Sequence, residues 1–368
     1  MKRLFVMLPL ILVLCACKEH EADRSQVLDD IVMSYMNKNN IPGAEVLIWI
    51  NGDFNYHRAF GFADIEKGIK RQINQPFRIA SISKTFTALR ILQMHDEGLI
   101  DINDSLVKYM PEFPNAEAIT LSDLLGMTSG ITDFADHDFL GIWYEDLDME
   151  FSMEKAVNIS AMKSDSFLSP GEKVVYSNVN YTLLGFIIEK VTGNSVGSEF
   201  SEHIFLPLGL QNTFYPSSDE LPGGLRGYSL EKEGFADVTK LNPAVPHTGG
   251  AVISDMNDLW IFVQALYNGS LISEDTLRKQ QETRTMDKSP EWVRYGLGIL
   301  DLGGFWGHNG TIFGFSSEMF YLPRDNAVII INVNRLDRDD KSWSGDLFLA
   351  LSKQLFPEGV KWNNFPGI

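Results

Sequence analysis

The 368-residue chain contains only two cysteines, Cys15 and Cys17, and both lie within its first 17 residues. Residues 18–368 therefore cannot form a disulfide, and their stability has to come from burial of a hydrophobic core. Hydrophobic residues make up 44% of the chain, a share that favours globular structure over disorder. The remaining length, about 350 residues, is enough for one large domain or two closely joined domains.

Several catalytic arrangements are missing as well. The seven histidines are scattered along the chain, with no His-x-x-x-His pair or comparable ligand spacing, so we expect no metal site. The glycines at 303, 304 and 307 are not followed by Gly-Lys-Ser/Thr, which excludes a phosphate-binding loop. The sequence therefore implies no metal and no other cofactor.

Positive charge is scarce. The chain has 31 lysines and arginines against 49 aspartates and glutamates, a formal net charge of −18. This balance excludes nucleic acid as a partner and argues against a polybasic attachment to anionic lipid. No apolar run reaches the roughly 20 residues that a membrane-spanning helix needs.

The first 17 residues have the composition of a secretory signal. A cationic head, Met1-Lys2-Arg3, precedes an almost wholly apolar run over residues 4–14 that is too short for a membrane span. The run ends in Leu14-Cys15-Ala16-Cys17, which resembles the lipobox of bacterial lipoproteins; the alternative is an ordinary signal peptide cut nearby. The resemblance implies a signal peptide over 1–17, lipidation of Cys17, a tether over 18–24, one domain over 25–360, and a membrane-anchored protein exported to the cell envelope.

The order of the expected elements predicts the fold class. Helical periodicity dominates the middle of the chain, while β-rich runs cluster near both ends, at 44–50, 54–62, 295–302, 305–309, 315–322 and 327–333. Helices are expected at 25–40 and 345–356. This order favours an α/β protein with an antiparallel sheet built from N- and C-terminal strands, flanked by helices and carrying an inserted, mostly helical lobe.

Capping residues mark several helix ends. Thr120 is expected to cap a helix over 121–127, and Ser254 a helix that carries the apolar stripe from Leu259 to Leu266. Gly98 and Gly193 follow apolar helical patterns and are expected to end them.

Ser81 and Lys84 form the first candidate catalytic pair. They are three residues apart at the expected start of a helix, so their side chains share one helical face. A serine hydroxyl is a poor nucleophile until a base takes its proton, and a lysine can be that base if burial or a nearby cation lowers its pKa. The free N–H groups of the first helical turn can also stabilise an oxyanion.

The spacing alone does not single out Ser81. Ser-x-x-Lys recurs at Ser105/Lys108, Ser152/Lys155, Ser160/Lys163 and Ser229/Lys232. The choice depends on the other motifs of the chain.

The segment from Phe77 to Phe86 resembles the serine β-lactamase and penicillin-binding family, in particular its class C β-lactamase and D-Ala-D-Ala carboxypeptidase branch. Further segments match in family order and extend the resemblance over most of the chain from Ile41 to Leu355. They are Leu124-Leu125-Gly126-Met127-Thr128-Ser129-Gly130, Ser169-Pro170-Gly171-Glu172 with Tyr176-Ser177-Asn178, Gly249-Gly250-Ala251-Val252-Ile253-Ser254, and Gly307-His308-Asn309-Gly310 with Phe313-Gly314-Phe315.

The resemblance implies a role for each matching residue. Ser81 would be the nucleophile and Lys84 its proton partner, while Tyr176 would pass the proton to the leaving group. Substrate would be bound by Asn178, Asn309, Gly310 and Thr311, with the backbone N–H groups of Ser81 and Thr311 forming the oxyanion hole. His308 would lie on a sheet edge facing Ser81.

Two other segments fit the family motifs. Tyr35-Met36-Asn37 fits the second motif but precedes any nucleophile, and His247-Thr248-Gly249 fits the third motif to the letter but leads into a helix, not into paired strands. His308-Asn309-Gly310 is therefore preferred. The chain also departs from class C β-lactamases, which mostly carry lysine and threonine at the positions of His308 and Asn309, whereas Met127 stands where many relatives have histidine. Since a neutral histidine holds a carboxylate less firmly than a permanent cation does, efficient antibiotic hydrolysis is disfavoured.

The resemblance implies a serine hydrolase that works through an acyl-enzyme. Its expected substrates are small peptides of D-amino acids, as for D-alanyl-D-alanine carboxypeptidases, with esters or β-lactams as alternatives. The alternative from another class is a non-catalytic penicillin or peptide sensor. The sequence does not fix the acyl group, the leaving group or the oligomeric state.

Overall fold

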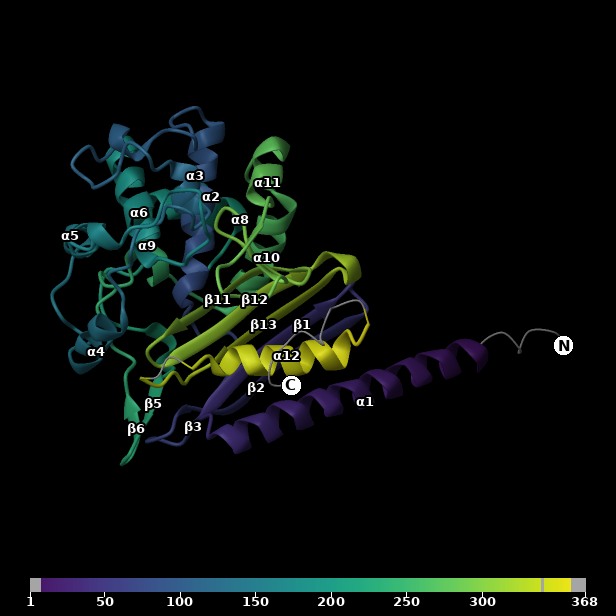
Figure 1. The fold of residues 1–368 in the computed structure, drawn as a ribbon. Helices are drawn as coiled ribbons and strands as arrows, with labels where there is room; N and C mark the ends of the chain where they lie inside the picture. The colour runs from purple at the N-terminus through teal and green to yellow at the C-terminus, as the bar shows by residue number, and fades with distance from the viewer. Residues whose placement is uncertain (1–7, 339–340, 359–368) are drawn as a thin grey trace.

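A computed structural model of the chain describes residues 8–338 and 341–358, with side chains from residue 24 onward. Its centre is a nine-stranded antiparallel sheet in the order β3-β2-β1-β13-β12-β11-β10-β9-β8 (Figure 1). The strands are β1 (Gly43–Ile50), β2 (Phe54–Asp64), β3 (Ile69–Lys70), β8 (Arg284–Thr285), β9 (Val293–Tyr295), β10 (Leu300–Leu302), β11 (Phe305–Ile312), β12 (Phe315–Leu322) and β13 (Ala327–Val333).

The two ends of the chain meet in the middle of this sheet. Strand β1 pairs with β13 in the register Ala44↔Val333 to Ile50↔Ala327, and β13 pairs with β12 on its other side. The predicted antiparallel sheet of N- and C-terminal strands is confirmed. Two small sheets accompany it, β4 (Phe77–Arg78) with β7 (Ile253–Ser254) and β5 (Tyr228–Glu231) with β6 (Gly234–Asp237).

Helices cover both faces of the sheet. Strands β12 and β13 are buried along their whole length because α1 and α12 lie over one face and α10 packs against the other (Figure 1). Most of the other helices form the lobe beside the sheet (Figure 1). The α-helices are α1 (Leu8–Asn39), α2 (Ser83–Asp96), α3 (Leu121–Leu125), α4 (His137–Glu145), α5 (Met153–Ala161), α6 (Asn178–Thr192), α7 (Val196–Phe200), α8 (Leu206–Leu208), α9 (His247–Gly250), α10 (Met256–Asn268), α11 (Glu274–Gln280) and α12 (Trp343–Leu355).

Short 3-10 and π-helical turns connect several of these elements. They are the 3-10 turns η1 (Ala80–Ile82), η2 (Leu106–Lys108), η3 (Ser164–Ser166), η5 (Pro222–Gly224) and η6 (Pro323–Asp325), and the π-helical turn η4 (Ser201–Phe205). The predicted N-cap Thr120 is confirmed, since it forms a capping box with Asp123. Gly193 ends α6 in the left-handed conformation, as expected.

Two expectations were wrong in detail. Helix α10 is capped by Asp255, whose side chain accepts from the backbone N–H of Asp258, whereas Ser254 belongs to strand β7. The run 295–302 is not one strand, because Gly298 has a positive φ of 76° and separates β9 from β10. A left-handed residue cannot continue a strand, so the chain turns back on itself there.

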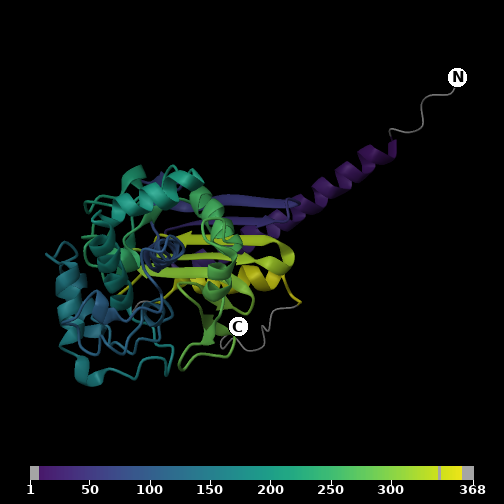
Figure 2. The ribbon, with the colours of Figure 1, turned by 90° about the horizontal axis from the view of Figure 1, so that it is seen from above.

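Helix α1 is longer than predicted and runs past the edge of the sheet (Figures 1 and 2). It includes residues 18–24, for which the sequence predicted a tether. Of the predicted signal peptide, residues 1–7 lie outside the described residues, and the side chain of Cys17 is not described. Within the described residues, no helix combines the length and apolar character needed to cross a bilayer. The lipid anchor stays a prediction.

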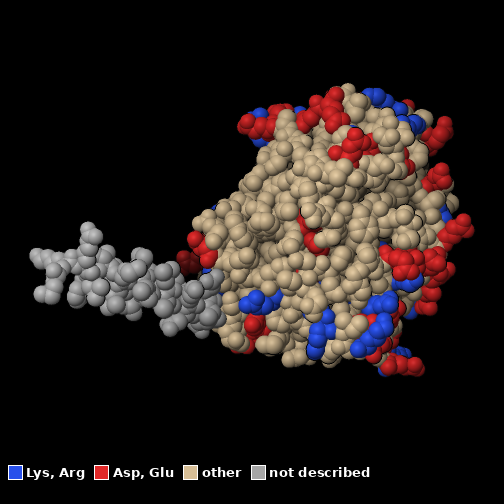
Figure 3. Space-filling view, turned by 180° about the vertical axis from the view of Figure 1, so that it is seen from behind, with Lys and Arg blue, Asp and Glu red and all other residues tan. Residues whose placement is uncertain are grey.

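The acidic side chains are spread over the surface. On the face shown in Figure 3 they form small groups near the rim, with lysines and arginines among them and few charges in the middle. This face carries no continuous basic stripe of the kind that binds nucleic acid.

Glu318 is a buried carboxyl under helix α12. Its Oε1 accepts from Ser344 Oγ at 2.9 Å and lies 3.5 Å from Ser342 Oγ. Burial raises its pKa to about 8, so the folded protein holds a proton there that the unfolded chain loses near pH 4.3.

A carboxyl pKa raised by folding stabilises the protein below the unfolded pKa, and this contribution is lost as the pH rises through 8. Between about pH 5 and 7.5, Glu318 should lower the free energy of unfolding by about 1.4 kcal/mol per pH unit. Urea unfolding across this range would give the free energy of unfolding at each pH. Its decrease per pH unit should be smaller by that amount in Glu318→Gln than in the wild type, while the exposed control Glu233→Gln keeps the wild-type pH dependence. Equal slopes for Glu318→Gln and wild type would contradict a buried neutral carboxyl.

Candidate active site

Ser81 lies in the turn η1, between strand β4 and helix α2. The preceding residue, Ala80, has a φ of 49°, in the left-handed region that a residue with a Cβ rarely adopts. Such a conformation costs about 1–3 kcal/mol and persists only where the surroundings hold it. Here Ile79 N donates to Val252 O at 3.1 Å, and β4 pairs with β7. The strained turn presents Ser81 to the cleft at the start of α2.

Lys84 is fully buried in the first turn of α2 and makes three polar contacts. Its Nζ lies 3.0 Å from Ser81 Oγ, 2.8 Å from Asn178 Oδ1 and 2.8 Å from Gly249 O. Asn178 Oδ1 and Gly249 O can only accept, whereas the Ser81 hydroxyl can donate. These three oxygens satisfy either form of the amine, because an ammonium donates to all three, whereas a neutral amine donates to two and accepts from the Ser81 hydroxyl.

The environment of Lys84 favours this neutral form. Burial lowers the pKa of Lys84 to about 7, against an opposing effect of the Asp133 carboxylate. A lysine that is partly neutral at neutral pH can take the proton of Ser81 as the serine attacks a carbonyl carbon.

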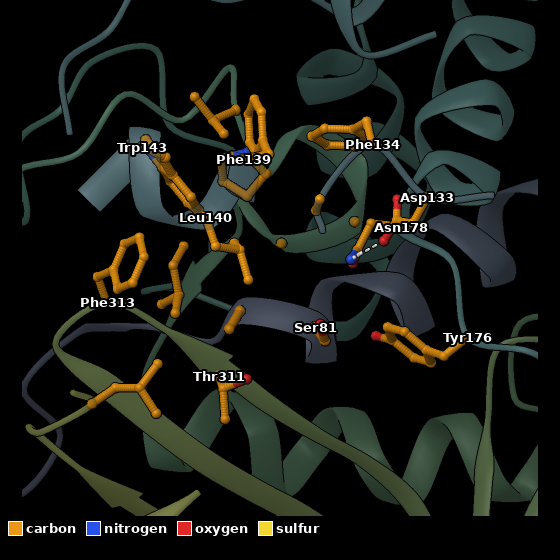
Figure 4. A pocket seen from close by; sticks show the side chains of 18 of the residues that line it. Ser81, Asp133, Phe134, Phe139, Leu140, Trp143, Tyr176, Asn178, Thr311 and Phe313 are labelled. Carbon is orange, nitrogen blue, oxygen red and sulfur yellow. Dashed lines mark hydrogen bonds between the residues drawn. The ribbon is translucent and has the colours of Figure 1, made fainter. Parts of the chain in front are cut away.

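Asn178 is held by a residue that the sequence did not single out. Asp133, in the loop before α4, accepts from Asn178 Nδ2 at 2.7 Å and from the backbone N–H of Val179 at 3.1 Å. Figure 4 shows the bond between Asp133 and Asn178 as a dashed line. The two bonds fix the amide so that its oxygen accepts from Lys84. No sequence motif includes Asp133; the only available signal was an acidic residue shortly after Thr128-Ser129-Gly130.

The segment His247-Thr248-Gly249 also fits the third family motif, but it contributes to the site in a different way. His247 belongs to the four-residue helix α9, is largely buried, and burial lowers its pKa to about 4. The segment supports Lys84 through Gly249 O, and Thr87 Oγ1 donates to Thr248 O at 2.7 Å. The segment His247-Thr248-Gly249 is therefore part of the wall behind Ser81. It is not the third family motif on a strand.

Tyr176 lies on the other side of the nucleophile. The Lys84 Nζ is 4.9 Å from the centre of the Tyr176 ring, and the ring faces Ser81 across the cleft (Figure 4). The structure thus brings Ser81, Lys84, Tyr176 and Asn178 together, as the resemblance implied.

Strand β11 forms the floor of the cleft. Strand β10 covers only its first residues, 305–307, so the edge of residues 308–312 is open toward η1. A Cβ on Gly310 would stand 2.3 Å from Ile79 O and 3.0 Å from Ser81 N. Only glycine allows this approach, which brings the backbone of Gly310 and Thr311 alongside that of Ser81, where the resemblance places the oxyanion hole.

His308 lies on the same face of β11 as Gly310, toward η1, but its ring does not line either cavity at Ser81. Its ring is fully buried, with Nε2 3.1 Å from the Tyr295 hydroxyl and Nδ1 2.6 Å from Asn309 O. Burial, with a smaller effect of Lys84, lowers its pKa to about 3. The ring centre lies 6.3 Å from that of Tyr176, so His308 is a neutral neighbour behind Tyr176 and does not line the cleft.

Two cavities meet at the nucleophile, and both include Ser81, Tyr176 and Thr311 in their walls. The first, about 380 Å³, lies beside Asp133 and Asn178 and is lined by aromatic side chains of the helical lobe (Figure 4). The second, about 320 Å³, runs along β11 past Asn309 and Gly310 and is lined by Met286, Ser289, Val293, Leu300 and Leu302.

The competing serines have structural roles. Ser152 caps α5, and Ser160 is a buried residue of that helix. Tyr35, of the early Tyr-x-Asn pattern, donates to Trp343 O at 2.9 Å. A Gly-x-Ser-x-Gly sequence, which marks the nucleophile of α/β-hydrolases, occurs at 193–197. Its Ser195 is exposed and caps α7. Among the described residues, no group of three or more potential metal ligands comes together.

The fold and this constellation are those of the serine β-lactamase and penicillin-binding class of proteins. The chain matches the Beta-lactamase family over residues 28–351 and belongs to it. This is a family of serine hydrolases that includes amidases, peptidases and β-lactamases.

Named relatives cover most of the chain. It is 32% identical to Protein flp of Staphylococcus aureus over 85% of its own length and 28% identical to Penicillin-binding protein 4* of Bacillus subtilis over 80%. It spans 63% and 68% of the length of these two relatives. A crystal structure of a D-stereospecific amidohydrolase from Streptomyces sp. is 28% identical, with a TM-score of 0.76 over 86% of this chain and 94% of the other.

The close approach at Gly310 gives a direct prediction. In Gly310→Ala the new Cβ must push β11 away from Ser81, which should lower kcat/KM for a p-nitrophenyl ester by about 100-fold, as loss of an oxyanion donor does. Gly141→Ala is the control, because its Cβ meets nothing within 4 Å in helix α4. Circular dichroism would show that both variants are folded. A folded Gly310→Ala enzyme with wild-type kcat/KM would contradict this assignment of the oxyanion hole.

Proposed function

We propose that the protein is a serine hydrolase that cleaves amide bonds of small D-amino-acid derivatives through an acyl-enzyme on Ser81. The observation that carries the proposal is the contact of 3.0 Å between Ser81 Oγ and a fully buried Lys84 whose pKa is lowered to about 7. A buried amine of this kind next to a serine hydroxyl supplies a base at neutral pH.

The reaction would proceed in two halves. Lys84 takes the Ser81 proton as Oγ bonds to the carbonyl carbon, and the developing oxyanion is stabilised by the N–H groups of Ser81 and Thr311. The bond to the leaving group breaks as the proton passes through Tyr176 to the leaving nitrogen. Water then adds to the acyl carbon and gives its proton back along the same path, which releases the acid and restores Ser81.

The residues that line the second cavity indicate which kind of leaving group it accepts. Its described lining residues include no lysine or arginine, and His308 lies behind Tyr176 with a pKa lowered to about 3. The described lining of this cavity therefore offers no cation to a free carboxylate, which a D-alanyl-D-alanine carboxypeptidase must hold. Neutral amide leaving groups fit this cavity better, in agreement with the D-stereospecific amidohydrolase among the similar structures.

A second candidate is an esterase of the same fold. The largely apolar walls of both cavities favour it, because an ester brings no charged group and its alcohol leaves more easily than an amine does. A β-lactamase is less well supported, since the β-lactam carboxylate would also lack a cation. The sensor is disfavoured because Ser81, Lys84 and Tyr176 form a complete proton path. Export and lipid anchoring at Cys17 belong to the proposal as well.

Intact-protein mass spectrometry and turnover assays would test the proposal. The wild type should form a transient adduct on Ser81 with a p-nitrophenyl ester and hydrolyse D-amino-acid amides faster than D-alanyl-D-alanine peptides. Ser81→Ala should lose the adduct and about 1,000-fold or more of the rate. The control Ser152→Ala, from another Ser-x-x-Lys pair, should keep both.

Three results would contradict parts of this assignment. Turnover that survives in Ser81→Ala would exclude Ser81 as the nucleophile. A permanent adduct with a fluorescent penicillin, without turnover of any ester or amide, would favour the sensor. Faster hydrolysis of D-alanyl-D-alanine peptides than of amides would favour assignment as a D-alanyl-D-alanine carboxypeptidase.

A further inference from the structure

Asp133 carries a negative charge into the wall of the 380 Å³ cavity. Its hydrogen-bond partners, Asn178 Nδ2 and Val179 N, are both neutral donors, and none of the ion pairs among the described residues includes it. A carboxylate has about four lone-pair sites, so two bonds leave it with acceptor capacity on the cavity side. Figure 4 shows Asp133 and Asn178 together on the side of the cleft that faces Ser81.

Asp133 uses one oxygen for each bond, since Oδ2 accepts from Asn178 Nδ2 and Oδ1 accepts from Val179 N in the first turn of α6. The negative charge also raises the pKa of Lys84, which opposes the burial that makes Lys84 a base. The charge therefore keeps more of Lys84 protonated at neutral pH, an effect that a cationic group of the substrate beside Asp133 would offset.

The rest of the cavity is apolar or already paired. Phe134, Phe139 and Trp143 come from the helical lobe and Phe313 from the end of β11, with ring centres 5.2 Å apart for Phe134–Phe139 and 5.1 Å apart for Trp143–Phe313. The one basic side chain in the lining, Arg338, forms an ion pair with Glu145 and lies over the ring of Tyr144. The cavity thus offers an aromatic body and a single carboxylate beside the nucleophile.

We propose that Asp133 binds the free α-ammonium group of the substrate's acyl residue, while the aromatic cavity holds that residue's side chain. The inference rests on the proposed function and names its substrate class: amides or short peptides whose N-terminal residue is large, apolar and unblocked. Asp133 is one hydrogen-bonded amide, Asn178, away from Lys84, and the α-ammonium is one carbon away from the carbonyl that Ser81 attacks. The volume of the cavity lies within the range of small-molecule sites.

A pair of substrates that differ only in the ammonium group tests the inference. kcat/KM would be measured for D-phenylalanine p-nitroanilide and for its N-acetyl derivative, with wild type, Asp133→Asn and the control Asp138→Asn. Asp138 is a fully exposed aspartate of the adjacent helix α4. The readout is the ratio of the two kcat/KM values, because a general effect on Lys84 or Asn178 changes both substrates alike.

A charge-assisted hydrogen bond between ammonium and carboxylate should favour the free amine by about 10-fold or more in the wild type. Asp133→Asn should lower this ratio by a similar factor, and Asp138→Asn should leave it unchanged. A wild type that prefers the N-acetyl substrate, or an Asp133→Asn ratio equal to that of the wild type, would overturn the inference.

Failure of the proposed function gives a different result. If a p-nitrophenyl ester acylates Ser81 but neither anilide is hydrolysed, the substrate assignment is wrong and the acyl-enzyme stands. If no compound forms an adduct on Ser81, both are wrong.

Discussion

A lysine amine removed from water must either find a full set of acceptors as an ammonium or give up its proton, and the site depends on how Lys84 meets this constraint. Its neighbours are one hydroxyl, one amide oxygen and one backbone carbonyl oxygen, with no carboxylate in contact. These oxygens satisfy either form of the amine, so burial without a directly bonded carboxylate shifts Lys84 toward the neutral form. A directly bonded carboxylate would have kept the proton on Lys84 and left Ser81 without a base, so Asp133 acts on Lys84 only from beyond Asn178.

The fold supplies this environment from segments far apart in the chain. Helix α2 carries Lys84, the first residue of α6 is Asn178, and the short helix α9 presents Gly249. Strand β11 closes the site from the sheet, where Gly310 allows its backbone to contact the strained turn at Ala80. Because β1 pairs with β13, strands from both ends of the chain complete the sheet that carries β11.

The sequence predicted the parts of this arrangement that depend on local patterns. The strands over 315–322 and 327–333, the N-cap Thr120 and the grouping of Ser81 with Tyr176 follow from turn signals, capping chemistry and motif order. Asp133, Gly249 and the burial of His308 could not be predicted in this way. Asp133 lies in a loop without a motif, Gly249 acts through a backbone oxygen that any residue has, and the position of His308 depends on the packing of Tyr295 from another strand.

The most direct test of Lys84 as the base that activates Ser81 is its protonation state. Nuclear magnetic resonance of the protein with isotope-labelled lysine would follow each side chain through a pH titration, with Lys84→Arg identifying its signal. We expect one lysine signal that titrates near pH 7 and is missing in Lys84→Arg, while exposed lysines titrate near their ordinary value of about 10.4. A Lys84 signal that stays protonated until about pH 10 would show that the buried amine is a permanent cation and not the base that activates Ser81.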